Sequence, residues 1–269
     1  MKSTNSEPPL VSVIMPTYNH AKFIGKAIES VLNQTYKNFE LIIIDNYSED
    51  DTEKIVVSYE DDRIIYLKFR NNGIIAASRN HGIKHSHGDY IAFLDSDDWW
   101  YREKLEVSVE VLKKGVQFVC HALDWYQNGT IIRTKKYGSR EKATYRHLLF
   151  GKNCVATSAT TVLRDSILRV GGFTEDPKAV GVEDYHLWLK LAKTGCTPEF
   201  IDQVLGCYRI YGRSQSSALV KQLNSEWWVL EDHFKALGRM SFLDRLLRWR
   251  RLGRLYASIT VRWFLRKVS

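Results

Sequence analysis

The sequence predicts an α/β protein with a mostly parallel sheet flanked by helices, followed by a basic amphipathic helical tail. Two observations predict the sheet. Strands and helices alternate over residues 10–98, and the strands are continuously apolar, as strands covered on both faces are. A third observation, the distribution of charge, predicts the basic tail. Residues 239–269 contain nine Lys and Arg against one acid, which accounts for the whole net charge of +8.

The composition argues against a secreted protein and against one with a membrane-spanning helix. The first residues are polar, so we expect 1–9 to be disordered and not to act as a secretory signal. The sequence has no apolar run of the roughly 18 residues that a membrane-spanning helix needs. Its four cysteines are scattered without a C-x-x-C pair, which favours reduced thiols in the cytoplasm over a zinc site or a disulfide framework.

The first half is predicted to alternate regularly between strand and helix. Apolar side chains at helical spacing indicate a helix at 22–34, for which Asn19 is the expected N-cap, and residues 48–51 are expected to form the capped start of the next helix. The expected strands are 10–15, 39–44, 64–69 and 91–94, and the expected helices are 22–34, 48–59 and 74–86.

Polar residues follow three of these strands. Pro16-Thr17-Tyr18-Asn19 follows the first, Asp45 ends the second, and Asp95-Ser96-Asp97-Asp98 follows the fourth. Ligands of parallel sheets bind at the carboxyl ends of the strands, near a switch in strand order. We therefore expect these three groups to converge at one edge of the sheet.

The acidic stretch is a candidate metal site. Asp95, Asp97 and Asp98 lie within four positions, and like charges so close repel unless something compensates them. Carboxylate oxygens suit Mg²⁺ or Mn²⁺, ions that are usually shared with phosphates. The alternative is a solvated acidic turn that caps a helix beginning near Trp100. We expect Asp95 and Asp97 to be the metal pair and Asp98 only to cap that helix.

The second half is less regular. Asn128-Gly129 predicts the turn of a hairpin over 125–132, and Gly171-Gly172-Phe173 predicts a tight loop. The remaining expected elements are a strand at 157–163, a helix at 183–194, an extended segment at 200–208 and helix beyond Ser214.

An ordered series of motifs resembles inverting glycosyltransferases of family two, which have the Rossmann-like GT-A fold. Each motif alone is weak, but the set covers roughly residues 10–215. This resemblance divides the chain into a catalytic domain at 10–215, with a nucleotide-binding half at 10–98 and an acceptor-binding half at 99–215, and a helical tail at 216–269. The motifs are 11–19, 30–35, 44–50, 80–82, 88–98, 171–173 and 182–188.

The resemblance implies where the donor would bind. Thr17, Tyr18 and Asp45 would hold the base and ribose of a nucleotide, with Pro16 and Asn19 in the same loop. Asn46 replaces a second acid that the family often has in its nucleoside-binding turn.

The resemblance also assigns the charged groups near the diphosphate. Arg79 matches a position that is often basic near the nucleotide, with a surface salt bridge as the alternative. Asp95 and Ser96 would face the donor. Asp95 and Asp97 would hold the Mn²⁺ or Mg²⁺ that offsets the charge of the leaving diphosphate.

A transfer that inverts the configuration at the anomeric carbon requires one catalytic base. The resemblance implies that this base is Asp184. This base would take the proton of the acceptor hydroxyl, while Glu183 beside it would contact substrate. The alternative is that two acids at a helix start only complement the helix dipole.

A loop at 208–214 matches one that closes over the diphosphate in the family. Arg209 would be a phosphate partner. Tyr211 stands where the family often has a histidine, so no metal or phosphate role is carried over to it.

The tail has apolar residues every three or four positions with arginines between them. This pattern suits an anionic membrane surface, contacted through 239–269. A helix packed on the domain, a dimer contact and nucleic-acid binding are the alternatives; the last is weakest because the basic residues lie on an apolar helix. The apolar residues are Phe242, Leu246, Trp249, Leu252, Tyr256, Ile259 and Trp263.

The sequence therefore predicts a metal-dependent transferase that moves a sugar from a nucleotide-diphosphate donor to a lipid-linked glycan in surface polysaccharide assembly. It would work in the cytoplasm, peripherally at the inner face of the cytoplasmic membrane, without a nucleic-acid partner. The alternatives are a nucleotidyltransferase of similar fold, against which the absence of a Gly-rich first loop argues, and an inactive sugar-nucleotide or membrane-binding module.

Overall fold

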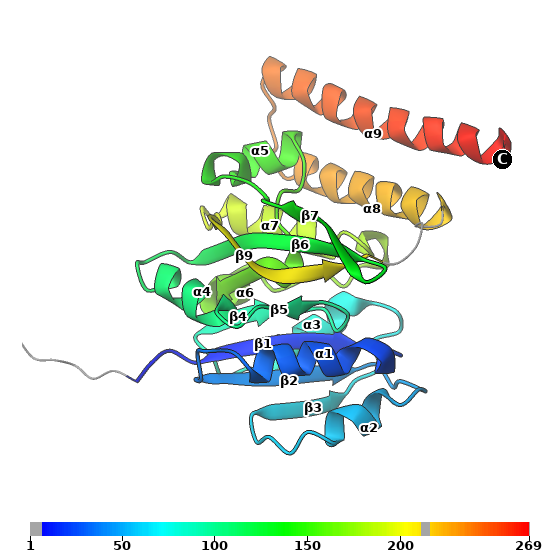
Figure 1. The fold of residues 1–269 in the computed structure, drawn as a ribbon. Helices are drawn as coiled ribbons and strands as arrows, with labels where there is room; N and C mark the ends of the chain where they lie inside the picture. Colours follow the sequence, from blue (N-terminus) through cyan, green and yellow to red (C-terminus); the bar gives the residue numbers. More distant parts are fainter. Residues whose placement is uncertain (1–6, 211–215, 269) are drawn as a thin grey trace, which may run out of the picture.

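The computed structural model describes the backbone of residues 7–210 and 216–268, and the side chains of 7–210 and 221–257 (Figure 1). Most of the predicted disordered start, 1–6, lies outside these residues, as does 211–214 of the predicted loop. Pro8 and Pro9 accept hydrogen bonds from Asn38 and Tyr36, so the described chain already contacts the domain at these positions.

The sheet confirms the predicted α/β architecture. Within the described residues it has nine strands, eight of them in the order β3-β2-β1-β4-β8-β6-β9-β5, while β7 pairs with β6. The first four strands of this order are parallel, whereas β8 runs antiparallel to both of its neighbours. The strands are β1 (Val11–Thr17), β2 (Phe39–Asp45), β3 (Ile64–Lys68), β4 (Tyr90–Phe93), β5 (Trp99–Trp100), β6 (Phe118–Gln127), β7 (Thr130–Lys135), β8 (Thr160–Leu163) and β9 (Glu199–Arg209).

Helices connect the strands and cover both faces of the sheet. They are α1 (Ala21–Leu32), α2 (Thr52–Val57), α3 (Ile75–Lys84), α4 (Lys104–Leu112), α5 (Tyr145–Phe150), α6 (Arg164–Arg169), α7 (Glu183–Lys193), α8 (Ser216–Lys235) and α9 (Phe242–Val268). Short 3₁₀ turns lie at η1 (Arg140–Ala143), η2 (Thr157–Ala159) and η3 (Pro177–Ala179).

Alternate residues of the parallel strands enter two different cores. Val13 and Met15 of β1 pack with Ile24 and other residues of α1, α2 and α4. Ile14, between them, belongs to the core on the opposite face, with Phe93 and residues of α3 and α7. Because strand side chains alternate between faces, continuously apolar strands need cover on both sides, as predicted.

Close packing of α3 explains two of the sequence motifs. A Cβ on Gly82 would lie 2.8 Å from Ile14 Cγ2, so only glycine lets α3 approach the sheet this closely. On the same helix, Asn80 accepts from the Phe173 N–H at 2.8 Å and donates to the Phe173 carbonyl at 2.9 Å. The Gly171-Gly172-Phe173 loop, with both glycines at positive φ, is thereby fixed against α3.

Several local predictions are wrong. The helix expected near Trp100 begins at Lys104, because Trp99 and Trp100 form β5 and pair with β9. Asn19 has a φ of 53° and is not the N-cap of α1, which is His20. The N-cap of α2 is Asp51, the last residue of the start predicted at 48–51, while the Ser48 N–H and hydroxyl bind the Asp45 carboxylate instead.

In the second half, the predicted hairpin is confirmed and the predicted strand is shorter than expected. Asn128 and Gly129, both at positive φ, join β6 and β7. The strand expected at 157–163 starts only at Thr160, after the 3₁₀ turn η2.

The tail folds as two helices stacked on the α5 and α7 side of the molecule, at the opposite end from β3 (Figure 1). Leu252 and Leu255 of α9 are buried, and Arg248 pairs with Glu231 of α8 at 2.8 Å. His186 Nε2 of α7 lies 3.5 Å from the Asp232 carboxylate of α8. None of the described helices combines the length and the apolar character that crossing a bilayer requires.

Candidate active site

A first cavity, of about 390 Å³, lies at the carboxyl ends of β1, β2 and β4. Thr17, Tyr18 and Ser96 line it together with Asp95 and Asp97, so the first and third predicted polar groups do converge. The Thr17 hydroxyl is buried and has no hydrogen-bond partner among the described residues. Pro16 also lines this cavity. A buried donor without a partner in a cavity is a natural contact for a ligand.

The second predicted polar group, Asp45, does not line the first cavity, although the next residue does. Its buried carboxylate accepts from Ser48 N–H at 2.8 Å, from the Ser48 hydroxyl and from the Tyr66 hydroxyl. Asn46, the next residue, lines the cavity in its place. Asn19 is not among the lining residues; its Oδ1 accepts from Glu49 N–H at 2.8 Å and so joins the two loops.

Within the acidic stretch, the surroundings of Asp98 differ from those predicted. Asp98 does not cap a helix: it is buried and accepts from the Arg209 N–H at 2.8 Å. Burial, and then the charges of Asp97 and Asp95, raise the pKa of the Asp98 carboxyl well above its usual value. Arg209 Nε donates to the Asp97 carbonyl at 3.0 Å, and its guanidinium lies over Trp99 at 4.9 Å. Arg209 therefore holds the acidic turn in place.

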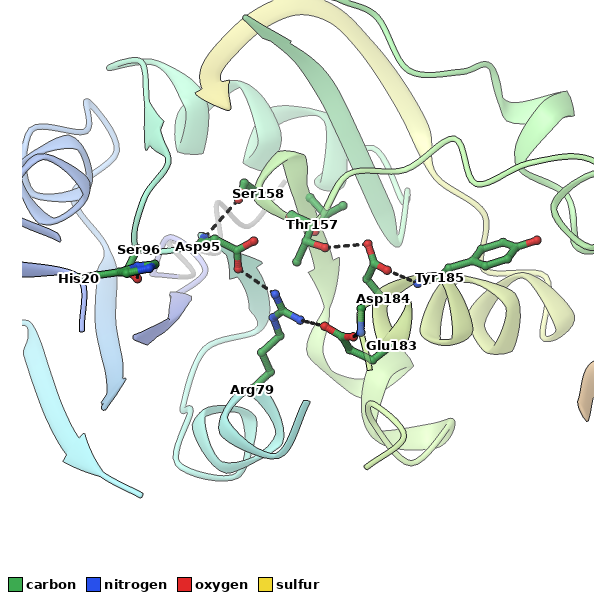
Figure 2. A network of polar contacts seen from close by, with 11 residues as sticks. His20, Arg79, Asp95, Ser96, Thr157, Ser158, Glu183, Asp184 and Tyr185 are labelled. Carbon is green, nitrogen blue, oxygen red and sulfur yellow. Dashed lines mark hydrogen bonds and ion pairs between the residues drawn. The ribbon is translucent and has the colours of Figure 1, made fainter. Parts of the chain in front are cut away.

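Arg79 joins the acidic stretch to the start of α7 (Figure 2). Its two terminal nitrogens donate to Asp95 and to Glu183, each at 2.8 Å, and its side chain is only 4% exposed. Burial opposes the charge of the guanidinium, but the two carboxylates more than offset this and raise the pKa of Arg79. The surface salt bridge considered as an alternative is thus a buried bridge between two candidate site residues.

Asp184 is held at the first turn of α7. Its Oδ1 accepts from the Tyr185 N–H at 2.6 Å, and its Oδ2 accepts from the Thr157 hydroxyl at 3.1 Å (Figure 2). Burial, and then repulsion from Glu183, raise the pKa of Asp184 to about 6, with Arg79 acting in the opposite direction. A carboxylate with such a pKa accepts a proton more readily than an exposed one while still ionised at neutral pH. Glu183 is occupied by Arg79 and by the Gly181 N–H at 2.7 Å.

A second cavity, of about 410 Å³, connects these groups. Asp95 lines both cavities, while Arg79, Glu183 and Asp184 line only the second of the two. Trp125 and Tyr208 form part of its wall, with their ring centres 5.5 Å apart. The two cavities therefore adjoin at Asp95, and Asp184 lies in the wall of the second.

The carboxylate oxygens of Asp95 and Asp97 suit a divalent cation as ligands. Asp95 and Asp97 both line the first cavity, and Asp95 also reaches the second, so oxygen ligands stand where the cavities meet. Mg²⁺ and Mn²⁺ prefer such oxygen ligands, and their charge offsets repulsion among neighbouring carboxylates.

Sequence reasoning did not assign a binding role to three polar residues of the first cavity, although it placed Asn46 in the nucleoside-binding turn. His20, Asn71 and Asn46 line it, and His20 Nδ1 lies 2.7 Å from the Ser96 hydroxyl. Asn71 follows β3, so the rule that ligands bind at the carboxyl ends of parallel strands could have indicated it. His20 gave no such signal, because its contact with Ser96 joins residues far apart in the sequence.

Two relatives described as glycosyltransferases resemble this chain over most of its length. A WfgD protein of Escherichia coli, described as a UDP-Glc:α-D-GlcNAc-diphosphoundecaprenol β-1,3-glucosyltransferase, is 36% identical over 87% of this chain and 90% of its own. The putative teichuronic acid biosynthesis glycosyltransferase TuaG of Bacillus subtilis is 33% identical over 87% of this chain and 91% of its own.

Two solved structures share the fold. The mannosyltransferase PcManGT of Pyrobaculum calidifontis, in complex with GDP-Man and Mn²⁺, has a TM-score of 0.65 and 18% identity over 98% of this chain and 76% of that one. TarS 1-349 of S. aureus, in complex with UDP-GlcNAc, has a TM-score of 0.67 and 19% identity over 81% of this chain and 65% of that one. These likenesses confirm the GT-A fold.

The family model described as glycosyl transferase family 2 matches residues 12–172, which is more than half of the chain. The motifs that suggested the resemblance fall mostly within this range, and four of them, 11–19, 44–50, 88–98 and 182–188, supply residues that line the two cavities. The chain therefore belongs to glycosyltransferase family 2.

Proposed function

We propose that this protein is a metal-dependent, inverting glycosyltransferase that moves a sugar from a nucleotide-diphosphate donor to a lipid-linked glycan acceptor in surface polysaccharide assembly. The observation that carries the proposal is the position of two carboxylates. Asp95 lies where the two cavities meet, and Asp184 lies in the wall of the second.

The donor would lie across both cavities. Its nucleoside would occupy the first, where the unpartnered Thr17 hydroxyl and the half-exposed ring of Tyr18 are available. Its sugar would enter the second, against Trp125 and Tyr208. The diphosphate would then lie at Asp95 and Asp97, which would hold the Mn²⁺ or Mg²⁺. When bound, that ion would offset the charge of the departing nucleoside diphosphate.

The chain's own residues would then perform an inverting displacement. Asp184 takes the proton of the acceptor hydroxyl as its oxygen forms a bond to the anomeric carbon. The bond between that carbon and the diphosphate oxygen breaks on the opposite face, and the nucleoside diphosphate leaves with the electron pair. Arg79 fixes Asp95 relative to Glu183, and through Glu183 it orients the start of α7.

A relative supports a lipid-linked acceptor, and the exposed surface of α9 supports contact with a membrane. WfgD is named for a lipid-linked acceptor, GlcNAc-diphosphoundecaprenol. On α9, Phe242, Leu246, Trp249 and Tyr256 form an exposed stripe, of which Trp249 is 77% exposed. We propose that this stripe contacts an anionic membrane peripherally, at the cytoplasmic face. Leu252 points inward instead, and the side chains of Ile259 and Trp263 lie outside those described.

A screen for nucleotide release tests the enzyme proposal. UDP-, GDP- and dTDP-sugars would be incubated with the protein and Mn²⁺, with and without EDTA. We expect release of one nucleotide diphosphate and its loss with EDTA. Absence of turnover and of metal-dependent binding with every donor would favour the inactive module, and formation of a sugar phosphate and a nucleoside triphosphate once pyrophosphate is added would favour the nucleotidyltransferase.

The pH dependence of kcat should follow Asp184. A base acts only when it is deprotonated, so a pKa of about 6 predicts that kcat is constant at neutral pH and falls about tenfold per pH unit below 6. The measurement is kcat at saturating donor from pH 4.5 to 8. A profile that stays flat down to pH 5 would exclude Asp184 as the base.

Membrane contact should depend on the exposed stripe. Replacing both Phe242 and Trp249 with serine should weaken binding to phosphatidylglycerol vesicles at least tenfold, because burying each such side chain contributes roughly 1.5–3 kcal/mol. The measurement is co-sedimentation with vesicles. Ile131→Ser is the control, because Ile131 is also exposed but lies on the hairpin. Unchanged binding of the double variant together with a monomer–dimer shift in solution would favour the dimer contact.

A further inference from the structure

A third cavity, of about 630 Å³, adjoins the second one at Asp184. Asn153, Gly181 and Gln222 also line both cavities. The three cavities therefore form a series, with Asp95 between the first and second and Asp184 between the second and third. A volume of several hundred Å³ is typical of a ligand site.

The third cavity carries more positive than negative groups. Lys152 follows α5, and Arg251 and Arg254 come from α9, while Asp184 and Glu226 are the acids of the lining. Arg251 is only 6% exposed, and its ion pair with Glu226 fixes it. Its Nε has no hydrogen-bond partner among the described residues. A buried charged group with an unused donor is costly unless a ligand completes it.

The direction of Arg254 is also fixed. Its Nη2 donates to the Phe150 carbonyl at 3.4 Å and its Nε to the Arg250 carbonyl at 3.3 Å. Guanidinium groups recognise phosphate oxygens through paired N–H donors, and a lysine adds a point charge. Lys152, Arg251 and Arg254 together thus suit an anion with several oxygens.

We infer that this third cavity binds the diphosphate that links the acceptor sugar to its lipid, through Lys152, Arg251 and Arg254. The inference rests on the proposed function. An acceptor hydroxyl must reach Asp184, so the acceptor sugar lies where the second and third cavities meet. The group attached to that sugar then extends into the third cavity. A neutral linkage would not use the cations there, whereas a diphosphate would.

The position of α9 supports the same assignment. This helix carries Arg251 and Arg254 toward the cavity, and it carries Phe242, Leu246 and Trp249 on the exposed stripe. One helix therefore faces both the diphosphate and the surface from which a lipid-linked substrate must come.

The test uses decyl diphosphate as a soluble probe, with binding measured by calorimetry. Lys152→Gln and Arg254→Gln should each weaken binding about tenfold, the usual loss for a charge-assisted hydrogen bond. Lys235→Gln is the matched control, because Lys235 is an exposed lysine of α8 outside the cavity lining, and it should keep the wild-type affinity. Equal affinity of both cavity variants and the control would overturn the inference.

A second arm distinguishes the diphosphate from phospholipid head groups. On phosphatidylglycerol vesicles the cavity variants should bind as the Lys235→Gln protein does. If they lose vesicle binding as strongly as they lose decyl diphosphate, the cations serve head groups and the inference is wrong. Nucleotide release from the donor without acceptor should be unchanged in these variants. Its absence in the wild-type protein would count against the proposed function, and not against the diphosphate site.

Discussion

Replacing Asp184 with asparagine should lower kcat by about 10²–10⁴-fold, because the loss of a positioned base typically costs that much. The fold should be kept. The carbonyl oxygen of the introduced asparagine can still accept the Tyr185 N–H, and its amide can donate to the Thr157 hydroxyl, so both contacts of Asp184 retain partners. Nucleotide binding should also be unchanged, because Asp184 is not among the residues that line the first cavity.

The measurement is kcat and the affinity for the nucleoside diphosphate, for the variant and for a matched control. Asp165→Asn removes an acid from the first turn of α6, away from the cavities, and should keep full activity. If Asp184→Asn keeps wild-type turnover, Asp184 only complements the dipole of α7.

Replacing Arg79 with alanine should lower the free energy of unfolding by about 3–5 kcal/mol, because it leaves two partly or fully buried carboxylates without their cation. Asp95 and Glu183 would lose a donor at 2.8 Å each. The variant should also be nearly inactive. Any residual activity should fall off at a higher pH than in the wild type, because Arg79 lowers the pKa of Asp184 and its removal raises that pKa further.

Urea unfolding and a pH profile check this prediction. Lys54→Ala is the control, because it breaks the exposed ion pair with Asp51, in which the lysine is 82% exposed. Exposed pairs contribute little, so the control should unfold near the wild-type midpoint. Equal midpoints for the Arg79 and Lys54 variants would show that the Arg79 bridge does not stabilise the domain.

Sequence patterns were sufficient to predict the parallel half of the sheet and the edge of the sheet at which the candidate site lies. The continuously apolar strands required a sheet covered on both faces, and the polar residues after β1 and β4 therefore met in one cavity. The positions of Asp95 and Asp97 at this cavity could be predicted because they depend on the end of a single strand; their role as metal ligands stays a prediction.

The errors concern residues whose surroundings are set by distant segments. Asp98 was expected to cap a helix, but β5 follows it and pairs with β9, which brings the Arg209 N–H to its carboxylate. The buried bridge of Arg79 to Glu183 was not foreseen either, because it joins residues 104 positions apart, whereas the position of Arg79 near the nucleotide stays a prediction. The inward face of α9 depends on its packing against α8, which the spacing of apolar residues in α9 alone does not specify.

The anomeric configuration of the product tests the central claim most directly. Once the screen has identified a donor, for example UDP-glucose with its α-linked sugar, the product would be analysed by proton NMR. Direct displacement with Asp184 as the single base predicts a β-linked product from that donor. An α-linked product would require retention, and it would contradict the assignment of Asp184.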